Sequence, residues 1–545
     1  MIWEYSLVAK FPDPIKIGLD QGWKTIDGAR LTSDLVLKAD VLIVGSGAGG
    51  ATAAEILTKA GLSVIIVEEG PLKSSSDFRM MEREAYPQLY QESAGRKTQD
   101  KAITILQGRC VGGSTTVNWT SSFRTPPQTL AHWQAVHGLA DYTQAALAPW
   151  FAMMERRLNI APWPVAPNEN NDILRRGCEK LGIPSAAIDR NVKDCLNLGY
   201  CGMGCPTNAK QSMLVTTIPA ALTGGATLLH RVRAERLLHG KEKISGLVGV
   251  GLNADGTCPG KYQVKISARH YVLAGGGINT PGLMLRSRLP DPHLTLGKRT
   301  FLHPTIVSAA LMPNKVEGYN GAPQTIYSDH FLDTLPLDGP IGYKLEAPPI
   351  HPILAGITLQ GYGAAHQTWM ARLSQMQVVI ALLRDGFHTQ SIGGKVNLRP
   401  DGSAVLDYPI SDYLWEGTRR AYLTMAEIQF AAGAKIVTPM HEDGKPLRGW
   451  KEAQQIINAL PMKALRASVV SAHVMGGCGM GADPKFSVVR GDGRHQQMEN
   501  LSVFDGSAFP TSIAANPQLS IYGMVARNAS ALAQHLNGKP APAIA

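Results

Sequence analysis

The hydrophobic pattern near the start of the chain predicts a strand, a tight turn, a helix and a second strand. Residues 41–44 are four consecutive apolar residues, mostly β-branched, as expected of a fully buried strand. Glycines follow in the pattern G-x-G-x-x-G, and a helix is expected over residues 51–60. A second buried strand is expected over residues 63–67, with Glu68 at its end. These elements in this order predict a dinucleotide site in a βαβ unit.

The residues of the glycine turn suit the binding of a pyrophosphate. Gly45 permits the tight turn, Gly47 lets the backbone approach the phosphates, and Gly50 lets the helix pack on the strand. The helix that follows directs its N-terminal N–H groups and the positive end of its dipole at the phosphates. Glu68 comes 18 residues after Gly50, where a carboxylate can accept the ribose hydroxyls. A glycine-rich turn of another α/β protein is the alternative.

Beyond this unit the pattern changes several times. A second glycine-rich loop at residues 106–118 is again suited to close contact with a ligand. Short alternating segments at residues 395–398 and 404–408 predict an antiparallel sheet. Helices are expected over residues 140–182 (interrupted at 162–167), 278–285, 368–384, 414–432 and 520–535.

Composition places the chain among globular proteins of more than one domain. It has 545 residues, 44% hydrophobic and 18% charged, and no run of the ~20 apolar residues that a membrane span requires. The net charge of +10 is scattered, without the basic and aromatic interleaving typical of nucleic-acid binding. No signal peptide is visible, which favours the cytoplasm; export with a partner that carries the signal would place the protein in the periplasm or at a membrane.

Together these motifs resemble the glucose-methanol-choline (GMC) oxidoreductases, a family of flavoenzymes. Matching blocks occur in order at residues 45–68, 108–118, 272–285 and 473–528, with a shorter one at 297–304. The resemblance covers roughly residues 38–310 and 385–540. It implies FAD rather than NAD in the glycine turn and removal of hydride from an alcohol carbon.

The resemblance also implies a fold of the α/β class with two domains. A Rossmann-like FAD-binding domain would comprise residues 38–140, 206–300 and 466–545. An α+β substrate domain built on an antiparallel sheet would comprise residues 141–205 and 301–465. Residues 1–37 would form an N-terminal arm.

The last matching block carries the implied chemistry. His473, in a His-x-x-Gly-Gly-Cys segment, would be the base that takes the alcohol proton; a buried histidine without a role is the alternative. Asn516 would orient the substrate oxygen; the alternative is that it only caps the helix that starts after Pro517. By the same resemblance, residues expected to bind FAD are Gly45, Gly47, Ala48, Gly50, Glu68, Glu69, Arg109, Gly112, Gly113, Ser114, Asn118, Val232, Gly275, Asp505, Gly506 and Pro517.

Three cysteines depart from the general family pattern. Cys195, Cys201 and Cys205 form C-x5-C-x3-C, followed by Pro206. This spacing resembles a branch of sugar dehydrogenases whose catalytic subunits carry a [3Fe–4S] cluster on three cysteines. The alternatives are reduced structural thiols, as in the similar loop of long-chain-alcohol oxidases, or zinc with a fourth ligand.

The cysteines decide between two functional hypotheses. With a cluster, the chain would be an FAD-dependent dehydrogenase of a sugar, polyol, aliphatic or alicyclic alcohol. Its electrons would pass to a cytochrome c or quinone, and a small subunit could accompany it and hold it at a membrane. Without a cluster, it would be a long-chain-alcohol or sterol oxidase that uses O2. A flavoprotein without catalytic function would need neither His473 nor Asn516.

Overall fold

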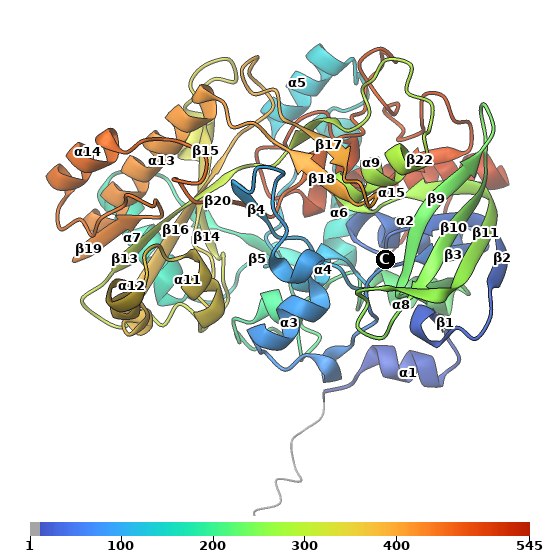
Figure 1. Ribbon diagram of the computed structural model, residues 1–545, viewed down its shortest axis with the longest axis horizontal. Coiled ribbons are helices and arrows are strands. Elements are labelled where there is room, and N and C mark those ends of the chain that lie inside the picture. Colours follow the sequence, from blue (N-terminus) through green and yellow to red (C-terminus); the bar gives the residue numbers. More distant parts are fainter. Residues whose placement is uncertain (1–10, 545) are drawn as a thin grey trace, which may run out of the picture.

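The computed structural model describes residues 11–544. Two eight-stranded sheets, each covered by helices, lie at opposite ends of the molecule (Figure 1). The chain passes between them several times, so segments far apart in the sequence meet where the two halves join. This junction contains the candidate active site.

The first sheet contains the predicted βαβ unit. Its strands run β1 (Lys24–Asp27), β8 (Thr227–His230), β3 (Val64–Val67), β2 (Leu35–Val44), β11 (Pro259–Leu273), β10 (Ile244–Leu252) and β9 (Val232–His239), with β22 (Leu501–Val503) beside β11. The strands from β1 to β11, and β22, pair in parallel, while β10 pairs antiparallel with both its neighbours. Helices α2 (Ala48–Lys59), α8 (Thr217–Thr223) and α15 (Gln518–Asn537) pack together beside this sheet. The predicted Rossmann-like sheet is confirmed.

The N-terminal part of the chain differs from the expected arm. Residues 24–27 add an edge strand to the first sheet, and β2 begins at Leu35, several residues before the predicted strand. Helix α1 (Pro14–Asp20) precedes them. Residues 1–10 of the predicted arm lie outside the described residues.

The second sheet has the predicted antiparallel character. Its order is β4 (Ile103–Ile105), β20 (Val469–Ser471), β13 (Thr305–Leu311), β16 (Met376–Leu383), β15 (Tyr343–Glu346), β14 (Ile326–Ser328) and β6 (Ala186–Ala187), with β19 (Ile436–Pro439) also paired to β13. Only the β4–β20 pair of these described strands is parallel. Helices α7 (Glu169–Lys180) and α13 (Asp412–Ala431) pack on one face.

The helix predicted over residues 368–384 is wrong for its second half. Residues 376–383 form β16, a central strand in which all eight residues are buried. Val379, Ala381 and Leu383 face α13, and the residues between them face the other side of the sheet. Because both faces of the strand are apolar, the sequence lacks the alternation that distinguishes a strand from a buried helix.

Two smaller sheets and nine further α-helices complete the described strands and α-helices. A four-stranded sheet has the order β18 (Ala404–Asp407), β17 (Gly394–Leu398), β12 (Lys298–Phe301) and β21 (Met475–Gly476), and β5 (Ile160–Pro162) pairs with β7 (Asp189–Asn191). Among the described residues no helix is long and apolar enough to cross a membrane. The other helices are α3 (Glu82–Leu89), α4 (Ser114–Val117), α5 (Pro127–His137), α6 (Gln144–Arg157), α9 (Gly276–Arg286), α10 (His330–Asp333), α11 (Pro352–Thr358), α12 (Gly363–Met370) and α14 (Trp450–Ala459).

Candidate active site

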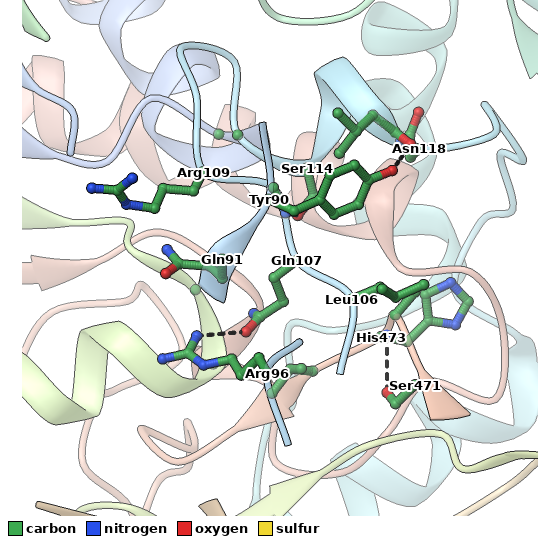
Figure 2. A pocket seen from close by; sticks show the side chains of 18 of the residues that line it. Tyr90, Gln91, Arg96, Leu106, Gln107, Arg109, Ser114, Asn118, Ser471 and His473 are labelled. Carbon is green, nitrogen blue, oxygen red and sulfur yellow. Dashed lines mark hydrogen bonds between the residues drawn. The ribbon is translucent and has the colours of Figure 1, made fainter. Parts of the chain in front are cut away.

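A cavity of about 760 Å³ lies at the junction of the two halves. Most of the residues predicted to bind FAD, together with His473 and Asn516, line this cavity. Gly50 and Gly112 do not line it, and neither do the three cysteines. Figure 2 shows His473 beside Leu106 and Ser471, across the cavity from Arg109. The structure therefore brings together segments that are more than 400 residues apart in the sequence.

The two glycine-rich loops face each other at one end of the cavity. A Cβ atom on Gly113 would lie 2.8 Å from the Cα atom of Gly47. The amide of Gly112 donates to Ser46 Oγ at 3.0 Å, which ties the loops together. Gly47 caps α2 and has no side chain to bind the first N–H groups of that helix. The cavity that both loops line and the N-terminus of α2 fit a pyrophosphate.

Gly50 does not line the cavity but allows helix α2 to pack closely on strand β2. A Cβ atom there would lie 2.0 Å from the carbonyl oxygen of Gly45, so α2 could not sit this close to its strand. Gly45 itself has φ +102°, which favours glycine. The predicted reasons for these two glycines thus match their surroundings.

Two buried carboxyl groups flank the glycine loops. Glu68 accepts hydrogen bonds from Ser46 N (3.0 Å), Ser46 Oγ (2.7 Å) and Gly70 N (2.8 Å). Asp505 accepts from Gly276 N (2.8 Å) and Thr280 Oγ1 (2.6 Å) at the start of α9. Burial raises the pKa of both carboxyl groups. These groups fix the two turns that approach the cavity, and Glu68 remains suited to accept a ribose hydroxyl.

His473 follows strand β20 of the second sheet and lines the cavity beside Leu106 (Figure 2). Burial, together with the positive charge of Lys344, lowers the pKa of His473 to about 4. The ring is therefore neutral near pH 7 and can accept a proton. Its Nδ1 atom lies 3.1 Å from Nδ1 of His303, a residue between β12 and β13. The backbone N–H of His473 donates to Ser471 Oγ at 3.2 Å (Figure 2).

Asn516 belongs to a buried polar cluster. Its Nδ2 atom donates to Glu346 Oε2 at 3.3 Å, and Gln324 Nε2 donates to the same oxygen at 2.6 Å. Asn516 Oδ1 and Glu346 Oε1 are buried and have no hydrogen-bond partner among the described residues. The amide nitrogen of Asn516 has a second hydrogen besides the one given to Glu346, and the predicted role requires that it be donated to the substrate oxygen. It also precedes Pro517, the N-cap residue of α15, which no side chain of the described residues caps.

The wall of the cavity beyond these residues is apolar. The face of β16 turned away from α13 contributes Met376, Val378, Ile380 and Leu382. The neighbouring wall comes from β13 and from α11 with the segment before and after it, and comprises Val307, Ala309, Ile350, Leu354, Ala355 and Leu359. We call this part of the cavity, defined by these ten residues, the apolar arm.

The cysteine loop lies outside the cavity and does not fit the predicted cluster. Among the described residues, no group of three His, Cys, Asp or Glu side chains is placed to hold a metal ion. Arg190 donates to Cys201 Sγ at 3.8 Å, and Cys205 Sγ lies 3.5 Å from Thr207 Oγ1. Cys195, Cys201 and Cys205 are free thiols. An arginine contacts one of these thiols and a hydroxyl group contacts another. An iron–sulfur cluster would instead require all three thiols to point at one centre.

A buried lysine ties this loop to the cavity wall. Lys210 Nζ donates to the carbonyl oxygens of Thr116 (2.7 Å), Asn118 (2.9 Å) and Cys201 (2.6 Å). Asn118 in turn donates to Gln518 on α15 at 2.6 Å. The cysteine loop therefore supports the second glycine-rich loop through hydrogen bonds.

Sequence reasoning missed three residues that the structure places at or next to the site. Ser46 lies inside the glycine motif but joins both loops. His303 lies in the short block at residues 297–304, and this was its only signal. Glu346 alternates with apolar residues in Tyr343-Lys344-Leu345-Glu346, so a period-two pattern could have placed it and Lys344 on one face.

Comparison with known proteins identifies the family. The models of the N- and C-terminal parts of GMC oxidoreductases match residues 39–305 and 393–525. The chain is 28% identical over 512 residues to long-chain-alcohol oxidase FAO4A of Arabidopsis thaliana, covering 90% of this chain and 68% of that one. It is 30% identical over 495 residues to the GMC-type oxidoreductase MT0511/MT0512 of Mycobacterium tuberculosis, covering 90% and 75%.

Solved structures show the same fold at lower identity. Pyridoxine 4-oxidase from Mesorbium loti superposes with a TM-score of 0.64 at 18% identity, covering 90% of this chain and 98% of that one. A formate oxidase of Aspergillus oryzae gives 0.66 at 14% identity, covering 93% and 100%. The predicted fold class is thereby confirmed, and the chain belongs to the GMC oxidoreductase family.

Proposed function

We propose that this protein is an FAD-dependent oxidase of long-chain aliphatic alcohols that uses O2 as electron acceptor. The observation that carries the proposal is the apolar arm, which leads directly to the candidate base. Strand β13 begins two residues after His303, and β20 ends two residues before His473. The polar residues of the site therefore lie at the ends of strands in this wall. An alcohol whose alkyl chain lies along the arm would place its hydroxyl group at His473 and Asn516.

The cofactor end fits FAD by its own geometry. The cavity beside the closely packed Gly47 and Gly113 and the N-terminus of α2 suit a pyrophosphate, while Glu68 suits a ribose hydroxyl. When bound, FAD supplies the acceptor for the hydride that leaves the alcohol carbon. His473 takes the hydroxyl proton on its ring nitrogen, and Asn516 holds the oxygen in place by hydrogen bonding.

The choice of oxidase over dehydrogenase rests on the cysteine loop and on the relatives. The three thiols do not converge as cluster ligands in the described part of the chain. Several curated relatives at 28–29% identity are long-chain-alcohol oxidases. These observations support the hypothesis in which the cysteines are structural.

The substrate class is tested by narrowing the apolar arm. Val378→Phe adds bulk to the wall, so we expect kcat/KM for dodecanol to fall about tenfold or more while that for butanol changes little. Val136→Phe, at an exposed position on α5, is the matched control and should leave the ratio unchanged. An unchanged ratio in the Val378 variant, or a wild type without preference for long chains, would contradict the proposal.

The acceptor is tested on purified holoenzyme. We expect one hydrogen peroxide per aldehyde formed in air, and flavin without stoichiometric iron or acid-labile sulfide. About three irons per flavin with slow use of oxygen would instead support the dehydrogenase hypothesis.

A further inference from the structure

The contact between His303 and His473 joins two buried, neutral rings. Their Nδ1 atoms are 3.1 Å apart, and their ring centroids are 5.3 Å apart with planes inclined by 30°. Burial lowers the pKa of both rings, with the positive charge of Lys344 acting in the same direction on each. Two neutral imidazoles can bond through these nitrogens only if one carries a proton and the other a lone pair. A single proton therefore occupies the line between them.

A set of shared hydrogen bonds holds together the two backbone segments that contain His303 and His473. Asp385 accepts from the backbone N–H groups of Leu302 (2.9 Å) and His303 (3.0 Å). Ser471 Oγ donates to the carbonyl oxygen of Leu302 and accepts from the backbone N–H of His473. The relative position of the two rings is thus fixed by backbone contacts.

His303 has an unfavourable backbone conformation at the position from which its ring contacts His473. Its φ is +49°, in the left-handed region that residues with a side chain seldom adopt. His303 Nε2 is buried and has no partner among the described residues, so its only ring contact through nitrogen is with His473. His303 keeps this unfavourable backbone conformation while its ring makes one polar contact, which suggests that the contact with His473 has a function.

We propose that His303 is a positioning residue that selects the active tautomer of His473. His303 Nδ1 accepts the Nδ1–H of His473, which leaves Nε2 of His473 unprotonated for the substrate hydroxyl. As the alcohol is oxidised, its O–H bond breaks and an N–H bond forms at His473 Nε2. The resulting imidazolium keeps its Nδ1–H on His303, which stabilises the positive charge. In the opposite tautomer His473 would carry its proton on Nε2 and could not act as a base.

This inference rests on the proposed function, because it assigns His473 as the base in alcohol oxidation. It adds a reason why a histidine with a lowered pKa can still take a proton. A neutral acceptor opposite Nδ1 favours the imidazolium without placing a second charge in the buried site. Lys344 is the charged group that acts on both rings, and Glu346 lies two residues from it on the same face of β15.

The test compares two variants of nearly equal shape. In His303→Asn, Oδ1 can replace Nδ1 as the acceptor, and asparagine tolerates the left-handed backbone. His303→Leu has a similar volume and no polar atom. We expect the anaerobic rate of flavin reduction at saturating alcohol to fall about 100-fold in the leucine variant and less than about tenfold in the asparagine variant. KM should change little in both, since the substrate contacts remain.

The outcomes that overturn the inference are equally specific. An unchanged rate in His303→Leu, or equal losses in both variants with normal flavin content, would show that the acceptor has no role. If the leucine variant fails to bind flavin, His303→Gly replaces it, because glycine adopts this backbone without strain; an unchanged rate there also overturns the inference. A wild type whose flavin no alcohol reduces would refute the proposed function instead.

Discussion

Asn516 and Glu346 form a buried pair in which the amide nitrogen donates to the carboxyl oxygen at 3.3 Å. The carboxyl group also accepts from Gln324, and its second oxygen has no partner among the described residues. Burial raises the pKa of Glu346 to about 7, although the charge of Lys344 and the bond from Asn516 act to lower it. The residue that fixes the orientation of Asn516 therefore titrates near neutral pH.

Replacing this carboxyl group should change how stability depends on pH. In the folded protein Glu346 holds its proton up to about pH 7, whereas in the unfolded chain it loses it near 4.5. The wild type therefore loses stability relative to Glu346→Gln as pH rises through this window, by up to about 3 kcal/mol. Chemical unfolding of both holoenzymes at pH 5 and pH 8 measures the difference. A constant difference across this range would contradict the raised pKa.

His473→Ala should bind FAD but lose most turnover. The side chain is not one of the groups that suit the pyrophosphate or the ribose, so flavin content should stay normal. Loss of the base should slow flavin reduction by about 100- to 10,000-fold. Stopped-flow reduction by alcohol measures the rate, and the flavin absorbance gives the content. An unchanged rate would support a flavoprotein in which this histidine is not catalytic.

Gly47→Val should yield a folded protein that does not hold flavin. The nearest atom to a Cβ at this position is the Cα of Gly113, 3.8 Å away, so the valine methyl groups would enter the cavity where the two loops meet. Flavin content after purification and circular dichroism check both parts. Gly240→Val is the matched control, because a Cβ atom there meets nothing within 4 Å and the site is distant from the cavity lining. Full flavin occupancy in the Gly47 variant would place the pyrophosphate elsewhere.

Lys210→Met should destabilise the protein and weaken flavin binding together. The change leaves three carbonyl oxygens without their donor and frees the segment at Asn118, at a cost of about 2–4 kcal/mol. Lys193→Met, at an exposed position close to the same loop, should change neither quantity. Melting temperature and the dissociation constant of FAD are the measurements. Equal behaviour of the two variants would mean that the cysteine loop is not coupled to the cavity.

The local part of the fold could be predicted from sequence because its signals are local. The unit from Gly45 to Glu68 places a glycine turn, a helix start and a strand end within 24 residues, and each has its own chemical reason. The final helix was expected at residues 520–535 and occurs as Gln518–Asn537. In both places neighbouring residues along the chain determine the structure.

The rest depends on contacts between distant residues. Residues 376–383 were predicted as a helix because a strand buried on both faces has no alternation of polar and apolar positions. His303 meets His473 across 170 residues, and Glu346 meets Asn516 across the same separation. The cysteine spacing suggested a metal, but spacing alone does not say where Arg190 and Lys210 will lie. The domain boundaries and the individual cofactor contacts stay predictions.

Strand β16 also bears on how enzymes of this fold can acquire new substrates. Every second residue packs against α13 and is constrained by the stability of the fold, while the residues between them border the apolar arm. Selection on substrate size can therefore act on Met376, Val378, Ile380 and Leu382 while their neighbours keep the strand in place. A single strand thus separates the positions that evolution must conserve from those that it can exchange.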